Sequence, residues 1–215
     1  KASGIHCGIR KNKTKRDLAL IVSDCKASAA AIYTLNLVKG APIYVTKDNI
    51  SDGVAQAMVC NSGNANTCNA DGEEKAEKMC HLTADALGIK PEEVIVASTG
   101  VIGQVLPIEP IEKAMPKLIL GLCVCGNEDA ATAIMTTDTV KKEVAVEFEL
   151  GGKVCHLGGM AKGSGMIHPN MATTLNFITT DCAISSEMLQ KALSEVVKIT
   201  YNCLSVDGDQ STNDM

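Results

Sequence analysis

Aromatic side chains are nearly absent from this chain of 215 residues, which has no Trp, 3 Tyr and 2 Phe. Base-stacking platforms for single-stranded nucleic acids are built from such rings, so their scarcity argues against that function. A basic stripe is also missing, and the formal net charge of −5 gives no reason to expect a nucleic-acid partner. The one basic run, residues 11–16, is short and predicts a solvated loop.

Long apolar runs are missing as well. No stretch approaches the roughly 20 apolar residues that cross a bilayer, so we expect no membrane segment. The composition, with 46% hydrophobic and 21% charged residues, is typical of soluble globular proteins. A chain of this length can bury a sizeable core, and its length alone allows one domain or two.

The 10 cysteines show no spacing that points to disulfides or to a metal. They are dispersed, several lie in apolar strand-like runs (Cys60, Cys155), and no secretory signal is recognisable. The pairs Cys123–Cys125 and Cys155–His156 lack the two-residue spacer and the second pair of a typical zinc site. We therefore expect reduced cysteines in a cytoplasmic protein, with no metal and no cofactor.

Strand-like and helix-like segments alternate along the chain, which predicts an α/β or α+β class with a layered core of sheet and helix. The predicted strands are residues 17–23, 29–34, 43–46, 54–60 and 94–97, followed by a hairpin of 142–150 and 154–157 with one wet face. The predicted helices are residues 71–88, 108–120 (disturbed by Pro116), 127–135 and one that starts at 185–187. The Asn-rich stretch 61–66 predicts a loop, either a plain turn or one that shapes a site.

The stretch from Lys162 to Asp181 carries the strongest indication of chemistry. A glycine-rich approach, residues 158–165, is followed by Pro169, which fixes φ shortly before an alternating β-branched run. This pattern predicts that the hydroxyl of Thr173 is held at the start of a strand. The same residues also fit a plain glycine loop that enters a buried strand, with threonines that merely suit β-structure.

A threonine hydroxyl is a weak nucleophile at neutral pH and needs a base within hydrogen-bond distance. One known arrangement makes the threonine the first residue of a chain, so that its own α-amine accepts the proton. Such an amine has a reference pKa of about 7.7–8.0 and is substantially unprotonated near neutral pH. An uninterrupted chain has no amine there, so the hypothesis requires cleavage between Ala172 and Thr173.

Motifs in four parts of the chain together resemble one family. Residues 162–173, with Lys-Gly at their start and Pro-Asn-Met-Ala-Thr at their end, are similar to the self-cleaving junction of the ornithine acetyltransferases, bifunctional enzymes of arginine biosynthesis. Residues 97–103, 133–139 and 205–214 match the same family in the same order. The resemblance covers essentially the whole chain and implies the family's self-processing N-terminal-threonine acyltransferase fold.

The resemblance implies roles for four residues besides the junction. The family's oxyanion hole falls on Thr99 and Gly100. Its substrate-binding threonine falls on Thr136, with the neighbours Thr137 and Asp138 as alternatives, and its substrate-binding lysine falls on Lys162. An ammonium such as that of Lys162 can pair with a substrate α-carboxylate. Taken alone, Ser98-Thr99-Gly100 also fits a plain turn, and Lys162 also fits a solvated surface lysine.

The junction implied by the resemblance is Ala172–Thr173, with Thr173 as nucleophile and as part of the substrate site. Cleavage there divides the chain into an α subunit, 1–172, and the start of a β subunit, 173–215. The family suggests a heterotetramer of two α and two β subunits. Thr174 stands where the family often has Met, so the choice of Thr173 over its neighbour depends on the motif alignment. The chain ends within a polar motif, and we expect further site residues beyond it.

The family's reaction is ping-pong transfer of an acetyl group from N-acetylornithine to glutamate through an acetyl-threonine intermediate. Some members also accept acetyl-CoA as the donor, and no residue here decides that point. Two other functions fit the residues. A related self-processed threonine amidohydrolase or aminopeptidase would pass the acyl group to water, and a non-catalytic binding domain would keep the fold without using the junction.

Overall fold

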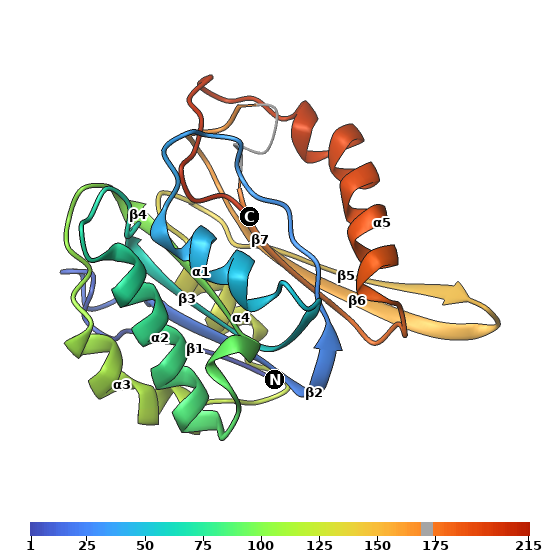
Figure 1. The fold of residues 1–215 in the computed structure, drawn as a ribbon, viewed down its shortest axis with the longest axis horizontal. Coiled ribbons are helices and arrows are strands. Elements are labelled where there is room, and N and C mark those ends of the chain that lie inside the picture. The colour runs from blue at the N-terminus through green and yellow to red at the C-terminus, as the bar shows by residue number, and fades with distance from the viewer. Residues whose placement is uncertain (169–173) are drawn as a thin grey trace.

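The computed structural model describes residues 1–168 and 174–215, which form two β-sheets with helices packed on them (Figure 1). The predicted junction, Ala172–Thr173, lies outside the described residues. The strands are β1 (Ala2–Ile5), β2 (Leu18–Ser28), β3 (Val54–Asn64), β4 (Val94–Val101), β5 (Lys142–Leu150), β6 (Lys153–Lys162) and β7 (Leu175–Thr180). The helices are α1 (Ala41–Asn49), α2 (Gly72–Leu87), α3 (Glu109–Leu120), α4 (Asn127–Ile134) and α5 (Ser186–Ile199), with short 3₁₀ turns at Pro91–Glu93 and Tyr201–Cys203.

The first sheet has the strand order β1-β2-β3-β4. Its first three strands pair antiparallel, whereas β3 and β4 pair parallel across the connection that contains α2. Successive side chains of a strand point to opposite faces. Leu18 and Leu20 therefore join the core on one face of the sheet, while Ala19 between them joins the core on the other. A strand buried on both faces needs apolar residues throughout, and the start of β2 has them.

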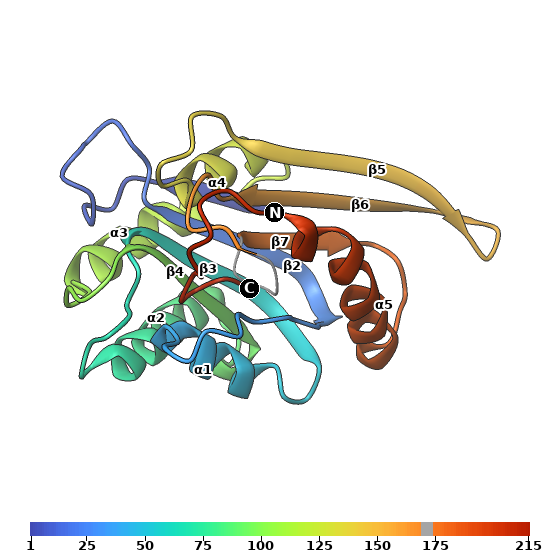
Figure 2. The ribbon, with the colours of Figure 1, turned by 90° about the horizontal axis from the view of Figure 1, so that it is seen from above.

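The molecule is layered around this sheet (Figure 2). Helices α1, α2 and α3 cover one face, where Met79 and Leu118 pack against Val59 and Val96. Helix α4 and the second sheet cover the opposite face, where Ile134 joins a smaller core. The predicted mixed class with a layered core is thus confirmed.

The second sheet is antiparallel with the order β5-β6-β7, and β5 and β6 form a hairpin that extends from the body (Figure 1). The predicted turn Gly151-Gly152 is confirmed, and both glycines have positive φ, +58° and +74°. The prediction that only one face of this hairpin is exposed to solvent agrees less well with the structure. Val144 and Val146, on the apolar side of β5, are 58% and 47% exposed, so the described residues leave this side largely uncovered as well.

The predicted helices are confirmed, with α2 ending at Gly88 in the left-handed conformation (φ +70°). The Asp71 side chain, at the N-terminal end of α2, forms no capping hydrogen bond with a backbone N–H group of the helix. Helix α3 continues through Pro116 rather than breaking there.

Two predicted strands are wrong. Residues 29–34 have no regular structure. The Ala29 N–H donates to the carbonyl of Gly53 and the Thr34 N–H to the carbonyl of Asp214, and neither partner belongs to a strand. Residues 43–46 belong to helix α1, which begins after Gly40 and has proline in its first turn.

The tertiary setting explains why β-branched residues form helix α1. Strand β4 is an edge strand, and an uncovered edge leaves backbone groups without partners. The Thr46 hydroxyl donates to the carbonyl of Val96 at 2.7 Å and accepts from its N–H at 2.9 Å. The Asn49 amide donates to the carbonyl of Val94 at 2.8 Å. Helix α1 therefore covers the sheet edge with side chains in place of a further strand.

Candidate active site

The parallel strands β3 and β4 end side by side, and Gly63 pairs with Gly100 just before their last residues. Gly100 has φ +137°, and a Cβ atom there would lie 2.4 Å from the backbone carbon of Gly63 and 2.6 Å from the nitrogen of Asn64. Only glycine fits this position, since the atoms in the way belong to paired backbone. Thr99 and Gly100 are thus part of β4 itself, and the predicted donor motif is rigidly placed at its end.

The Thr99 side chain lies on the inner face of the first sheet. It follows Ala97 by two positions, and Ala97 packs toward α4 and the second sheet. Thr99 is only 5% exposed, and none of the described residues forms a hydrogen bond with its hydroxyl. A threonine hydroxyl can donate one hydrogen bond, so Thr99 offers a candidate donor to a group that enters the site.

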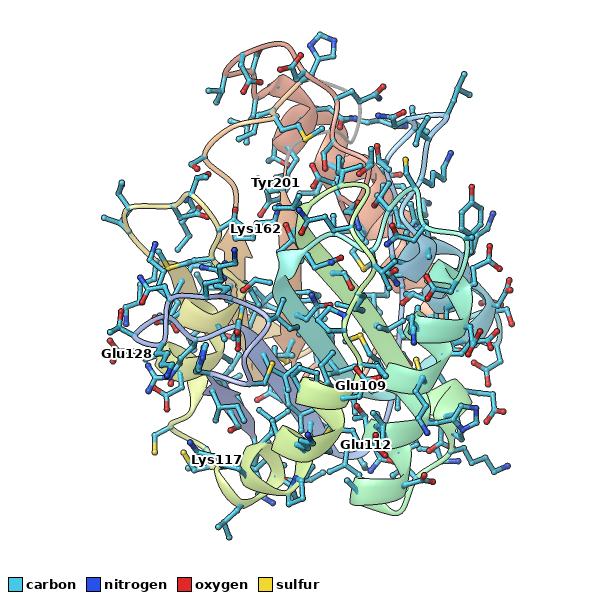
Figure 3. All side chains as sticks on the ribbon, turned by 90° about the vertical axis from the view of Figure 1, so that its left-hand side faces the viewer. Glu109, Glu112, Lys117, Glu128, Lys162 and Tyr201 are labelled. Atoms are coloured by element: carbon cyan, nitrogen blue, oxygen red, sulfur yellow. The ribbon has the colours of Figure 1, made fainter. Side chains whose placement is uncertain are left out.

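Lys162 ends strand β6 and faces the space between the two sheets. Met160, two residues earlier on the same face, packs against the core between the sheets. The Lys162 side chain is only 12% exposed, and its Nζ lies 3.9 Å from an oxygen of the Asp214 carboxylate. Figure 3 shows Lys162 near the strand ends, well away from the labelled charged residues of α3. The structure therefore contradicts the alternative of a solvated surface lysine.

Thr136 lies two residues after the end of helix α4 and is tied to the Lys162 region through Asp138. The buried Asp138 carboxylate accepts from the Thr136 N–H at 3.2 Å, the Gly163 N–H at 2.8 Å and Lys142 Nζ at 2.6 Å. Burial opposes ionisation of Asp138, but these bonds and the Lys142 charge outweigh it and lower its pKa. One carboxylate thus holds the Thr136 turn against the residue that follows Lys162.

The segment 211–214 connects the two sheets at this point. The Asn213 amide donates to the carbonyls of Ala65 at 2.6 Å and Ser98 at 3.0 Å, directly before Thr99. The next residue, Asp214, faces Lys162. The motif match covered this segment, but sequence reasoning assigned it no role, because nothing in its spacing shows that it returns to β4.

Arg10 adds a second cation that the sequence analysis missed, since it adjoins a basic run predicted to be solvated. Its Nη2 donates to the carbonyl of Met135, next to Thr136, and its Cγ would meet a Cβ on Gly63 at 2.8 Å. Burial lowers the pKa of Arg10, although the nearby Asp17 opposes this shift. The Arg10 Nε is buried without a hydrogen-bond partner among the described residues.

The Asn-rich stretch turns out to brace the loops around this end of the sheet. Strand β3 runs to Asn64, so the predicted loop starts later than expected. The Asn61 side chain accepts from the Ser98 hydroxyl at 2.6 Å, and Asn64 Nδ2 donates to the carbonyl of Gln104 at 3.0 Å. Asn66 adopts positive φ, +50°. The Asn61 and Asn64 side chains therefore hold the end of β4, which contains Thr99, and the loop that follows it.

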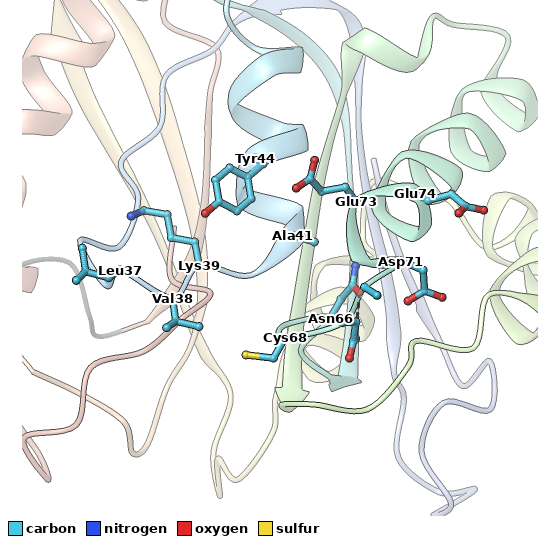
Figure 4. Close-up of a pocket in the computed structure, with 12 residues that line it drawn as sticks. Leu37, Val38, Lys39, Ala41, Tyr44, Asn66, Cys68, Asp71, Glu73 and Glu74 are labelled. Atoms are coloured by element: carbon cyan, nitrogen blue, oxygen red, sulfur yellow. Dashed lines mark hydrogen bonds between the residues drawn. The ribbon is translucent and has the colours of Figure 1, made fainter.

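A cavity of about 560 Å³ lies on the other side of this loop, between Lys39, Tyr44, Cys68 and Glu73 (Figure 4). None of the residues that line it is a predicted site residue. We place the site at the strand ends instead, because the predicted residues Thr99 and Lys162 lie there, together with the Asp214 carboxylate, whose Oδ2 is buried without a hydrogen-bond partner.

Thr99, Gly100, Thr136 and Lys162 therefore meet at one end of the two sheets, linked through Asp138 and the segment 211–214. Ala172 and Thr173 lie outside the described residues. Within the described ranges, no group of His, Cys, Asp and Glu residues is arranged to hold a metal ion. In the same ranges, no helix has the length and apolar character needed to cross a bilayer.

Sequence comparisons give a consistent result over the whole chain. The model of the ArgJ family matches residues 1–215. The arginine biosynthesis bifunctional protein ArgJ of Symbiobacterium thermophilum is 48% identical over 216 residues, a match that covers 100% of this chain and 54% of that protein. The protein of the same name from Bacillus subtilis is 47% identical over 216 residues, with 100% and 52% covered. The chain spans about half the length of the curated relatives it matches.

Two solved structures are similar. The crystal structure of arginine biosynthesis bifunctional protein ArgJ from Bacillus halodurans has a TM-score of 0.72 and 42% identity, and the match covers 79% of this chain and 88% of that chain. The structure of ornithine acetyltransferase complexed with ornithine from Mycobacterium tuberculosis has a TM-score of 0.69 and 33% identity, with 78% and 90% covered.

Proposed function

Since the chain belongs to the ArgJ family, we propose that the whole protein transfers an acetyl group from N-acetylornithine to glutamate in arginine biosynthesis. The name of the Mycobacterium tuberculosis relative, an ornithine acetyltransferase solved with ornithine, supports this choice of substrate. The proposed intermediate is an acetyl ester of Thr173.

The observation that carries the proposal is the environment of Lys162. An ammonium has three donors, and a lysine is rarely buried unless it is paired. Here the side chain is 12% exposed, no described residue forms a hydrogen bond with Nζ, and the nearest carboxylate is 3.9 Å away. A charge-assisted hydrogen bond would be about 2.7–2.9 Å long. We infer that the open donors receive the α-carboxylate that N-acetylornithine and glutamate share.

The proposal includes self-cleavage at Ala172–Thr173. The Thr173 hydroxyl attacks the Ala172 carbonyl, the amide nitrogen leaves as the new α-amine of Thr173, and water hydrolyses the ester that links the two parts.

Cleavage would leave the two parts together. Strand β7, which follows the junction, pairs with β6, which precedes it, from Leu157↔Thr180 to Lys162↔Leu175. Leu175 is fully buried, and Phe177 joins the same core between the sheets. Residues 1–172 and 173–215 would therefore act as subunits of one folded unit, for which we propose the family's assembly of two α and two β subunits.

In the proposed transfer, the α-amine of Thr173 accepts the hydroxyl proton as the oxygen attacks the acetyl carbonyl of N-acetylornithine. The tetrahedral intermediate carries a negative oxygen, which the Thr99 hydroxyl and the Gly100 N–H would stabilise; losing one such donor typically costs a factor of about 10²–10³ in rate. Ornithine leaves with a proton on its amine. The amine of glutamate then attacks the carbonyl of the acetyl ester. N-acetylglutamate forms, and the Thr173 oxygen leaves and takes up the proton lost by the amine, which restores the free hydroxyl.

The proposal also covers a substrate contact at Thr136, the cofactor and the location of the protein. Thr136, held beside Gly163 through Asp138, is proposed to contact the substrate. We propose that the reaction needs no cofactor. Acetyl-CoA is a possible second acetyl donor, and it would be a substrate. A cytoplasmic location fits the cysteines, all of which are free thiols.

The test is to incubate the full-length protein with N-acetylornithine alone and map the acetylated residue by mass spectrometry. An added acetyl on an N-terminal Thr173, transferred to glutamate on its addition, is expected. The Thr173→Ala variant serves as the control and should remain one polypeptide without label. A label elsewhere would reject the nucleophile, and release of acetate that glutamate does not intercept would indicate the hydrolase alternative.

A further inference from the structure

Asp214 is a buried carboxylate at the proposed site to which the proposed reaction gives no task. Its exposed fraction is 1%. One oxygen, Oδ1, accepts from the Ser211 hydroxyl at 2.7 Å and lies 3.9 Å from Lys162 Nζ. The other, Oδ2, is buried without a hydrogen-bond partner in the described part of the chain. A buried carboxylate with an unpaired oxygen is unfavourable for folding alone, so a functional reason is expected.

The backbone holds this carboxylate in place from several directions. The Thr34 N–H donates to the carbonyl of Asp214 at 3.0 Å, and the Thr34 hydroxyl donates to the carbonyl of Ser211 at 2.8 Å. The Gly40 N–H donates to the carbonyl of Thr212 at 2.9 Å. Figures 1 and 2 show this last part of the chain running into the middle of the molecule. Asp214 is thus a fixed charge, whereas the flexible Lys162 side chain is the partner that can move.

Among the neighbours of Asp214, Lys162 is the charged group that acts on its carboxylate. Ser211 lies on its own segment and Thr34 on the segment before α1, and both are neutral. Lys162, on β6, supplies the opposite charge. Without Asp214, the ammonium would have no ionic partner among the described residues and would be free to leave the space between the sheets.

We propose that Asp214 is a positioning residue that holds the Lys162 ammonium between the sheets, ready for the substrate carboxylate. This inference rests on the proposed role of Lys162 in substrate binding. The separation of 3.9 Å is too long for a direct hydrogen bond, so the Lys162 donors stay available while the charge attraction limits where the ammonium lies. Asp214 acts through Lys162 and does not touch the reacting atoms.

A pH dependence follows from this arrangement. Burial raises the pKa of Asp214 above its ordinary value, while Lys162 and the Ser211 hydroxyl act in the opposite direction. As the pH falls through this raised pKa, Asp214 becomes neutral and no longer attracts Lys162. The KM for N-acetylornithine should therefore rise on the acid side. N-acetylornithine itself has no group that titrates between about pH 5 and 8, so the change would report the enzyme.

The test compares wild type with Asp214→Asn in the full-length enzyme, measuring kcat and KM for N-acetylornithine from about pH 8 to about pH 5. Asparagine keeps the volume and can accept from Ser211. At pH 8 the variant should raise KM about tenfold with kcat changed less than about threefold. Its KM should also stay flat where that of wild type rises. An unchanged KM, a wild-type pH profile, or a fall in kcat alone would overturn the positioning role.

A second variant covers the case in which Asp214→Asn fails to fold, as judged by circular dichroism. Ser211→Ala removes a donor that favours the ionised carboxylate, so the rise in KM should begin at a higher pH than in wild type. An unshifted profile would also overturn the proposal. Glu128→Gln is the matched control, because Glu128 pairs with the surface residue Lys141 at 3.1 Å, and no change in KM is expected.

The proposed function can fail separately. If wild type transfers no acetyl group, binding of ornithine can be measured by calorimetry on the same variants over the same pH range. Weaker binding to Asp214→Asn at pH 8 would then support the positioning of Lys162 even though the reaction is a different one. Equal binding to both proteins would reject the inference by itself.

Discussion

Gly100→Ala is the substitution whose effect the structure defines most sharply. The position has φ +137°, and a methyl group there would lie 2.4 Å from the backbone carbon of Gly63 and 2.6 Å from the nitrogen of Asn64. Both atoms belong to β3, which pairs on its other side with β2. The contact cannot be relieved by rotating a side chain, so the two strands must separate or the backbone must change its conformation.

The size of the effect can be estimated from two contributions. A non-glycine residue in such a sparsely populated backbone region costs of order 1–3 kcal/mol. Overpacking against atoms that cannot move costs typically about 1–3 kcal/mol more. Gly→Ala also reduces the entropy of the unfolded chain, which returns about 0.4–1 kcal/mol. A loss of about 1–5.5 kcal/mol in the free energy of unfolding is expected.

Gly103→Ala provides a control from the loop that follows β4. Gly103 also has positive φ, +77°, but nothing lies within 4 Å of a Cβ built there. This variant carries a conformational strain of about 1–2 kcal/mol without the collision. After the same entropy return it should lose only about 0–1.5 kcal/mol. Urea unfolding followed by circular dichroism gives both values from the shift in midpoint at constant slope. Equal midpoints for the two variants would refute the argument that the β3–β4 contact requires glycine.

Two further predictions concern charged groups of the site. Lys162→Met keeps most of the side-chain length but removes the ammonium, so KM for N-acetylornithine should rise at least about tenfold in steady-state assays. Lys141→Met is the surface control, and its KM should equal that of wild type. Equal KM values for Lys162→Met and wild type would exclude a contact between Lys162 and the substrate carboxylate. Asp138→Asn should lower the urea midpoint at pH 7, because hydrogen bonds and Lys142 hold the pKa of Asp138 below its ordinary value. The ionised form then stabilises the fold above the unfolded pKa, so the difference from wild type should shrink as the pH falls below about 4, and a difference independent of pH would contradict this account.

Local patterns predicted much of the fold correctly. Helix α2 follows from its apolar periodicity and from Gly88 at its end, and the β5–β6 hairpin follows from alternation on both sides of Gly151-Gly152. These features depend on neighbours along the chain, which a sequence displays directly. The prediction failed at residues 43–46, where the β-branched side chains suited a strand, but the edge of β4 is covered by the Thr46 hydroxyl from a helix.

The candidate site likewise contains residues that motifs in the sequence reveal and a residue whose role only the structure reveals. Thr99, Gly100, Thr136 and Lys162 could be named from motifs, because each motif lies in one short stretch of sequence. Asp214 received no role although its motif was matched, because its meaning depends on Lys162, which is 52 positions away in the chain but 3.9 Å away in space. The roles of all these residues in the reaction stay predictions.

The sequence by itself determined the class of fold, the family and the residue types that could perform acyl chemistry, because periodicity and motif order are properties of the chain alone. Only the tertiary structure decided that Lys162 is enclosed between two sheets, that Asp138 and the segment 211–214 join separate elements around it, and that Asp214 opposes its charge. The physical reason is that burial and electrostatic attraction depend on distances through space, which are set only when the two sheets pack together.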